Sequence, residues 1–372
     1  MNTPIKLLLD MHLRGGERYN DIPHRAVFSA TIRLMFDTVL PIISNAKHIV
    51  VIQGENPDGD SLGSSLALED LLSEQGKTVT MYCAINMPKY LRYINGWDRV
   101  VSDFPYSADM AIIVDTAAQA LIENALSTHG VRAFFESHPV VVLDHHGEND
   151  DDGSQNDLSF PHEFVMSGTA AATGELIYEL ARTAAWNITP VAAENLYISI
   201  AADTLGLSTR AVTASTYQTT ADLVKAGAVP AEVEDRRREF MKKPADILTY
   251  KGELISRIEY HLDGKLATVH IPWEDIQEYS DRYNPSVLVL DEMRLVDSVE
   301  VACAIKTYPD GKVTGKLRCN SPVASTIAGY FGGGGHSYAA GFKVFEGYDK
   351  IVCELLDATD KALEEYHVTE SL

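Results

Sequence analysis

Short apolar runs alternate with segments of helical periodicity over the first 203 residues of this 372-residue chain. The apolar runs lie at 48–52, 79–84, 110–114 and 140–143. Strands of this kind, separated by helices, predict a parallel sheet that is covered by helices on both faces. Ligands of such sheets bind beyond the carboxyl ends of the strands, so the residues that follow these runs are the first candidates for a functional site.

Four separate segments bring carboxylates or imidazoles to this edge of the predicted sheet. They are Asp58 with Asp60, Asp115, the run Asp144, His145 and His146, and Asp203. Several carboxylates in one place repel each other unless a cation lies among them. Oxygen ligands mixed with imidazole suit a divalent transition ion such as Mn²⁺, and a pair of such ions can activate water for a phosphoryl displacement. The pattern therefore predicts metal-dependent hydrolysis of a phosphoester.

Each aspartate taken alone has a simpler explanation as a helix cap or turn residue. Asp58 and Asp60, for example, precede a predicted helix and could cap it. Capping does not explain acids at consecutive strand ends, nor two adjacent histidines, His145 and His146, in a setting predicted to be buried. The metal site is the better interpretation of the whole set.

The second part of the chain has a different texture. After about residue 245, strand-like runs are joined by tight turns, and a helical pattern over 348–365 follows them. We expect an N-terminal extension over 1–24, an α/β domain over 25–229, a connecting segment of mixed charge over 230–247 and a smaller α+β domain over 248–372.

A glycine-rich segment stands out in this second domain. Gly333, Gly334 and Gly335 precede His336, and Arg318 closes a predicted strand upstream. Glycines let the backbone approach an anion closely, while arginine and histidine add charge-assisted hydrogen bonds. A glycine run alone more often ends a helix, but its combination with Arg318 and His336 favours a phosphate-binding segment.

The charge balance restricts the partners. The chain has 31 Lys and Arg against 53 Asp and Glu, a formal net charge of −22, which disfavours long nucleic acid, duplex included. Its four scattered cysteines fit neither a disulfide framework nor a zinc knuckle, and no apolar stretch is long enough to span a membrane. We expect a cytoplasmic protein without a membrane partner, and any nucleic-acid partner should be short; assembly as a homodimer stays open.

Five motifs in this order resemble those of the DHH phosphoesterases. They are Asn56-Pro-Asp-Gly-Asp-Ser-Leu-Gly-Ser, Asp115, Leu143-Asp-His-His-Gly, Ala202-Asp-Thr, and Gly332-Gly-Gly-Gly-His-Ser-Tyr-Ala-Ala-Gly-Phe. The last resembles the substrate-binding domain associated with the nanoRNase and pAp phosphatase branch and with RecJ-like exonucleases. The resemblance extends over about 47–342, and it implies a DHH domain with a parallel sheet followed by that smaller domain.

The resemblance also implies two Mn²⁺ positions that share Asp115. The first would be held by Asp58 and Asp115. The second would be held by Asp60, Asp115, His145 and Asp203. Whether one or both positions are filled stays open at this point.

Further roles, and one departure, follow from the same resemblance. His146 would face the scissile phosphate and the attacking water, and Asp144 would orient a histidine. The family usually has a histidine four residues before its first aspartate, where this chain has Gly54. Glycine cannot bind a metal, so water, Gln53 or Glu55 would have to substitute; an exposed loop acid is the favoured interpretation of Glu55 because neighbouring residues point in different directions.

The implied substrates are short oligoribonucleotides, linear dinucleotides or 3′,5′-bisphosphonucleosides such as pAp. The glycine-rich segment would hold the substrate's phosphate or nucleotide end. Two alternatives stay open. One is a nucleotide-binding or regulatory protein with weakened catalysis, which Gly54 would explain. The other is a RecJ-like exonuclease for single strands, which the acidic charge disfavours.

Overall fold

A computed structural model describes residues 24–146, 156–280 and 282–370 of the chain. The expected extension over 1–24 therefore lies almost wholly outside the described residues. The chain divides into two compact units, with the boundary between Met241 and Lys242. Within the described ranges, no helix is both long enough and apolar enough to cross a membrane.

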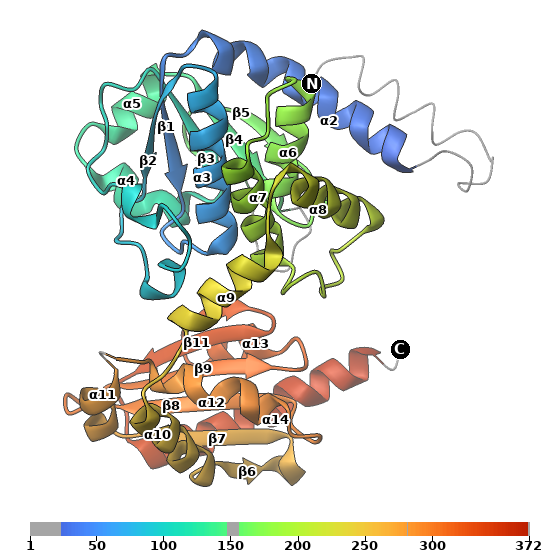
Figure 1. The fold of residues 1–372 in the computed structure, drawn as a ribbon. Helices are drawn as coiled ribbons and strands as arrows, with labels where there is room; N and C mark the ends of the chain where they lie inside the picture. Colours follow the sequence, from blue (N-terminus) through green and yellow to red (C-terminus); the bar gives the residue numbers. More distant parts are fainter. Residues whose placement is uncertain (1–23, 147–155, 281, 371–372) are drawn as a thin grey trace. The chain divides into compact units, whose positions relative to one another are not determined.

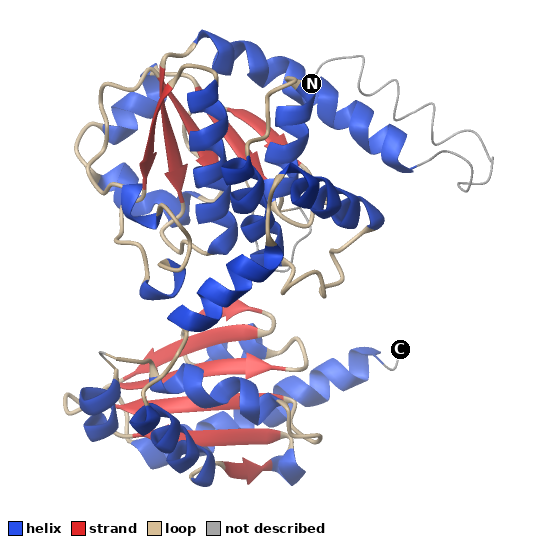
Figure 2. Cartoon of the chain, in the orientation of Figure 1, coloured by secondary structure: helices blue, strands red, loops and turns tan. Residues whose placement is uncertain are grey.

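The first unit contains a sheet of five strands, all parallel, in the order β2-β1-β3-β4-β5 (Figures 1 and 2). The strands are β1 (His48–Gln53), β2 (Thr78–Tyr82), β3 (Met110–Val114), β4 (Val140–Asp144) and β5 (Glu163–Met166). This confirms the predicted parallel sheet. The short strand β5 was not predicted, because its four residues include an exposed glutamate and carry little apolar signal.

Helices cover both faces of this sheet, as expected from its apolar strands. In β1, Ile49 and Val51 pack into one core cluster, while Val50 and Ile52 pack into the other. The first cluster is completed by α2 (His24–Asn45), α3 (Gly59–Glu74), α6 (Thr173–Thr183), α7 (Pro190–Asp203) and α8 (Ala214–Ala226). The second is completed by η3 (Gln119–Ile122), α4 (Glu123–Ser127) and α5 (Val131–Ser137). The short helices η1 (Lys89–Leu91) and η2 (Trp97–Arg99) pack with α3 and α7 in a smaller cluster.

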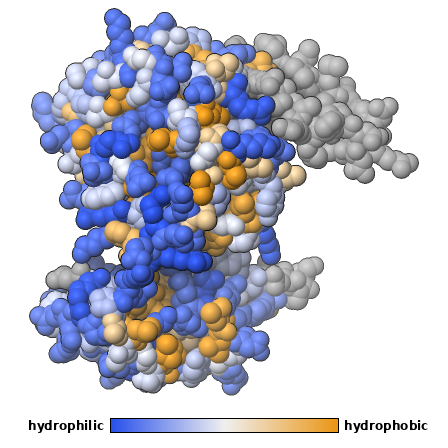
Figure 3. Space-filling model, viewed as in Figure 1, coloured by the Kyte–Doolittle hydropathy of each residue, from blue (hydrophilic) through white to orange (hydrophobic). Residues whose placement is uncertain are grey.

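The expected connecting segment forms helices. It contains α9 (Pro230–Phe240), the end of the first unit, and the start of α10 (Ala245–Ser256). Glu234 of α9 pairs with Arg237 and Arg238 one turn along the same helix. Paired charges of this kind are typical of a helix surface that faces solvent. The face of the molecule drawn in Figure 3 is mostly hydrophilic, with scattered apolar residues.

The second unit contains a mixed sheet of six strands in the order β10-β11-β9-β8-β7-β6. The strands are β6 (Glu259–His261), β7 (Leu266–Ile271), β8 (Val301–Thr307), β9 (Val313–Cys319), β10 (Gly334–His336) and β11 (Ala339–Val344). One face packs on α13 (Ala324–Tyr330) and α14 (Tyr348–Glu370). The other packs on α10, α11 (Trp273–Tyr279) and α12 (Pro285–Arg294), with η4 (Leu262–Gly264) between β6 and β7. The predicted α+β class is confirmed.

Candidate metal centre

The predicted ligands lie at the carboxyl edge of the first sheet. Asp58 caps α3 and Asp60 lies in the first turn of that helix, directly after β1. Asp115 follows β3, and Asp144 is the last residue of β4. Asp203 is the last residue of α7.

His145 lies at the middle of this group. Its Nε2 atom is 3.6 Å from Asp60 Oδ2, 3.6 Å from Asp115 Oδ1 and 3.3 Å from Asp203 Oδ2. Its Nδ1 donates to the carbonyl of Ala170 at 3.3 Å. In the neutral imidazole this leaves Nε2 unprotonated, with its lone pair toward the carboxylates.

The environment of His145 Nε2 fits a divalent cation. The atom is buried and has no hydrogen-bond partner among the described residues. Candidate ligand atoms of Asp60, His145 and Asp203 all lie within 4.8 Å of one another, as do those of Asp115, His145 and His146. Buried polar atoms normally have a hydrogen-bond partner. An imidazole nitrogen together with several carboxylate oxygens is the kind of ligand set that binds a divalent transition ion.

The carboxylates of this group disfavour one another's charge. Burial raises the pKa of Asp115 well above its usual range, and repulsion by Asp60, Asp58 and Asp203 raises it further. Burial, followed by repulsion from Asp60, raises the pKa of Asp203 to about 6. A bound cation would offset this repulsion and restore the ionised forms.

Asp60 is held by hydrogen bonds from three elements. It is fully buried. Its Oδ1 accepts from Ser64 Oγ at 3.0 Å and from Ser199 Oγ at 2.5 Å, and its Oδ2 accepts from the backbone N–H of Thr173 at 2.8 Å. Ser64 belongs to the first motif of the sequence analysis. The sequence did not single out Ser199 and Thr173, because they lie 139 and 113 residues from Asp60 in the chain.

Asp115 owes its position to an unusual backbone conformation. Its φ is +62°, in the left-handed region that few residues other than glycine adopt, although aspartate tolerates it better than most. Its N–H donates to Leu143 O at 2.9 Å, which extends the bonding between β3 and β4 past the last residue of β3. Such conformations cost on the order of 1–3 kcal/mol and concentrate at functional sites.

Asp144 contacts His146 rather than His145. Its buried carboxylate accepts from the ring Nδ1 of His146 at 2.7 Å and from the His146 backbone N–H at 3.2 Å. The rings of His145 and His146 lie 4.3 Å apart between centroids. Asp144 thus orients the ring of His146, and the catalytic roles of this pair stay predictions.

The first predicted metal position is less complete. Asp58 Oδ1 accepts from the N–H groups of Asp60 and Ser61, both at 3.0 Å, so the capping interpretation holds for this residue. Among the described residues, neither group of close ligand atoms around His145 includes Asp58. Its role as a metal ligand stays a prediction.

The residues near Gly54 differ in what they could supply. Both carboxylate oxygens of Glu55 accept hydrogen bonds from Asn124, and one also accepts from Ala125 N–H. These bonds occupy Glu55 at the start of α4. Gln53, in contrast, is buried at the end of β1, and neither atom of its amide has a partner in the described part of the chain.

The second unit contains a groove of about 730 Å³ that is lined by predicted substrate-binding residues. Arg318, Gly333, Gly334 and Gly335 all line it. Cβ atoms at Gly333 and Gly335 would collide with β11, at 2.2 Å from Gly341 O and 2.6 Å from Ala340 Cα, whereas Gly334 has open space. The backbone of His336 in β10 pairs with Ala339 in β11, and the His336 side chain lies outside what the structure describes.

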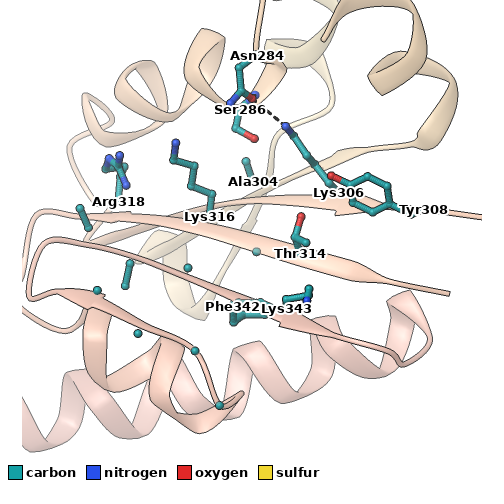
Figure 4. A pocket seen from close by; sticks show the side chains of 18 residues that line it. Asn284, Ser286, Ala304, Lys306, Tyr308, Thr314, Lys316, Arg318, Phe342 and Lys343 are labelled. Carbon is teal, nitrogen blue, oxygen red and sulfur yellow. Dashed lines mark hydrogen bonds between the residues drawn. The ribbon is translucent and has the colours of Figure 1, made fainter. Parts of the chain in front are cut away.

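Lysines that the sequence analysis missed also line this groove. Lys306 of β8 and Lys316 of β9 lie on the same side of the sheet as Arg318 (Figure 4). Lys343 of β11, which pairs with Thr314 of β9, lines the groove as well. Lys306 donates to Asn284 Oδ1 at 2.8 Å. Burial lowers the pKa of Lys306 and of Lys316. Repulsion lowers these pKa values further, because Lys316 lies near Lys306 and Arg318 lies near Lys316.

We call this groove, with Lys306, Lys316, Arg318 and Lys343 in its lining, the cationic groove. Its like charges suit a polyanionic ligand. A signal was present in the sequence. Thr314, Lys316 and Arg318 alternate with apolar or small residues, which is the period of a strand with one polar face.

Known proteins share this architecture. Residues 48–203 match the DHH family, N-terminal domain. The chain is 28% identical over 289 residues to the bifunctional oligoribonuclease and PAP phosphatase NrnA of Thermus thermophilus, a match that covers 77% of this chain and 81% of that protein. It is 21% identical over 318 residues to the protein of that name from Bacillus subtilis, covering 84% and 95%.

A solved structure has a similar fold. The exopolyphosphatase-related protein from Bacteroides fragilis superposes with a TM-score of 0.75 at 19% identity, over 90% of this chain and 96% of that one.

Proposed function

We propose that this chain, whose residues 48–203 match the DHH family, N-terminal domain, is a DHH phosphoesterase that hydrolyses short phosphorylated substrates with Mn²⁺ as its cofactor. One observation carries this proposal: the buried Nε2 of His145, without a hydrogen-bond partner among the described residues, faces carboxylate oxygens of Asp60, Asp115 and Asp203. When bound, the ion would supply Lewis acidity and a water of lowered pKa.

The residues that would hold the ion are Asp60, Asp115, His145 and Asp203. Imidazole among the carboxylates favours Mn²⁺ over Mg²⁺, which prefers oxygen ligands alone. A second ion beside Asp58 would bind more weakly. Gly54 supplies no ligand, the Glu55 carboxylate is bound by Asn124, and one oxygen of Asp58 caps α3.

His146 is the residue that we assign to the scissile phosphate. Asp144 accepts from His146 Nδ1 at 2.7 Å, so it fixes the orientation of the ring. A protonated imidazole can donate to a phosphate oxygen or to the leaving oxygen.

The cationic groove is the expected binding place for the substrate's phosphate or nucleotide end. Lys306, Lys316 and Arg318 concentrate positive charge there, in a chain whose net charge is −22. Short substrates suit this distribution, because a long polyanion would also meet the acidic remainder of the surface. We propose short oligoribonucleotides, linear dinucleotides or pAp as substrates, because two relatives carry the name bifunctional oligoribonuclease and PAP phosphatase.

The test compares the purified protein with its His145→Ala variant. We expect the parent, with Mn²⁺, to convert the dinucleotide pApA to AMP and to remove a phosphate from pAp. His145→Ala should abolish both reactions, while His129→Ala, which changes an exposed histidine, should leave them unchanged. Turnover by His145→Ala at the parent's rate would refute the metal assignment.

Two other outcomes would favour the alternative functions. Nucleotide binding without turnover in Mn²⁺, Mg²⁺ and Co²⁺ would indicate a protein with weakened catalysis. Faster cleavage of a long single strand than of pApA would indicate a RecJ-like exonuclease.

A further inference from the structure

A short segment between β5 and α6 contacts three of the proposed metal ligands. It comprises residues 170–174 and ends in the first turn of α6. No metal-binding motif of the sequence includes it. Its contacts with the metal centre come from both backbone and side-chain atoms.

Thr173 makes two of these contacts. Its backbone N–H donates to Asp60 Oδ2 at 2.8 Å, and its hydroxyl donates to Asp115 Oδ1 at 3.1 Å. These two oxygens are also the atoms that lie 3.6 Å from His145 Nε2. One residue therefore orients both carboxylates toward the same imidazole nitrogen.

Neighbouring residues of the segment hold the rest of the group. The carbonyl of Ala170 accepts from His145 Nδ1 at 3.3 Å. The N–H of Gly174 donates to Ser199 Oγ at 2.9 Å, and that hydroxyl donates to Asp60 Oδ1. A Cβ at Gly174 would lie 2.1 Å from Ser199 Oγ, so glycine is required for this approach.

The segment is itself anchored by a buried acid. Glu175 Oε2 accepts from Ala171 N–H at 2.7 Å and from Thr216 Oγ1 at 3.3 Å. Glu175 is only 7% exposed. A buried carboxylate bonded in this way fixes the backbone on the N-terminal side of Thr173.

We propose that Thr173 is a positioning residue of the metal centre, which sets the orientation of Asp60 and Asp115 for a divalent cation. Thr173 acts through these carboxylates and not by touching the ion. Without its hydroxyl, Asp115 loses a donor at the oxygen that faces His145, and the mutual repulsion of the acids then opposes their convergence. Partners of metal ligands are typically worth about 10–100-fold in metal affinity.

The test is the dissociation constant of Mn²⁺, measured by electron paramagnetic resonance of free Mn²⁺ or by calorimetry. Thr173→Val keeps the shape and the backbone N–H to Asp60 but removes the hydroxyl. We expect it to raise the dissociation constant about 10-fold or more. Thr173→Ser, which retains the hydroxyl, should restore binding close to that of the parent.

The control is Thr359→Val, at a fully buried threonine of α14 whose hydroxyl has no partner within the described ranges. It should leave Mn²⁺ binding unchanged. Unfolding by urea in EDTA gives the stability of each variant without metal. This measurement shows whether weak Mn²⁺ binding by a variant results from misfolding. If Thr173→Val is misfolded, Thr173→Ser alone is compared with the parent.

This inference depends on the proposed Mn²⁺ site, and the two can fail separately. If the parent binds no Mn²⁺, the proposed cofactor is wrong. If the parent binds Mn²⁺ and a folded Thr173→Val binds it equally well, or if Thr173→Ser binds as weakly as Thr173→Val, the positioning role is refuted.

Discussion

Asp203→Asn should raise the free energy of unfolding of the metal-free protein. In excess Mn²⁺ it should leave the variant less stable than the parent. The pKa of Asp203 rises from 3.8 to about 6 because burial and Asp60 disfavour its charge. A shift of about 2 units corresponds to about 3 kcal/mol. Since 33% of the side chain faces solvent, screening reduces this to roughly 1 kcal/mol.

The size of this stabilisation depends on pH. Above pH 6 Asp203 is ionised in both the folded and the unfolded chain, and the folded chain alone bears the repulsion. Below about pH 4 the carboxyl is protonated in both states, and the difference disappears. Asp203→Asn should therefore raise the free energy of unfolding by roughly 1 kcal/mol at pH 8 in EDTA, and this gain should fade between pH 6 and pH 4.

Mn²⁺ should reverse the order of the two proteins. The variant lacks a carboxylate ligand, so we expect its Mn²⁺ dissociation constant to rise by at least about 10-fold. Ligand that binds only the folded state stabilises it in proportion to the logarithm of its concentration over the dissociation constant. In excess Mn²⁺ the parent should become the more stable protein.

Urea unfolding, with and without Mn²⁺, measures both effects. Hydrogen exchange of the buried β3 and β4 amides assigns the change to the first unit. Asp357→Asn, at an exposed position of α14, is the control and should show neither effect. Destabilisation of the metal-free protein by Asp203→Asn at pH 8, or an equal effect at pH 8 and pH 4, would show that charge repulsion at Asp203 does not destabilise the folded chain.

Two further substitutions separate the groove from the metal centre. Lys316→Gln should raise KM for pApA and reduce the dependence of KM on salt, because Lys316 lies in the cationic groove. Its Mn²⁺ affinity should not change. Steady-state kinetics at two salt concentrations test this prediction, and an unchanged KM would contradict it. Gly54→His should tighten the weaker Mn²⁺ site, because a Cβ there meets only Thr116 and Leu121 at ordinary distances of 3.5 and 3.7 Å. Calorimetric titration against Gly54→Ala measures this, and identical titrations would argue against the first metal position.

Much of the metal centre could be predicted because its ligands follow strands in a regular way. Asp58, Asp115 and Asp144 each lie at or shortly after the end of an apolar run. Parallel strands bring such ends to one edge, so the order of motifs along the chain was enough to group them. The same regularity did not reveal β5, whose apolar signal is too short.

Contacts between distant segments were not predictable. Thr173 lies 113 residues from Asp60 and 58 residues from Asp115 in the chain. Nothing local distinguishes it from other threonines at the start of a helix. The hydrogen bonds of Glu55 were not predictable either. Its carboxylate accepts from N–H groups at Asn124, and this contact depends on how the loops after β1 and β3 meet.

The sequence alone thus determined the classes of both folds, the order of the acids and histidines and the chemistry that they suggest, because these depend on local periodicity and residue type. Tertiary structure decided which nitrogen of His145 faces the carboxylates, that Asp144 pairs with His146, and which lysines share a groove with Arg318. Those features depend on strand register and on side-chain hydrogen bonds between remote residues, which form only when the packed chain brings the partners within about 3 Å of each other.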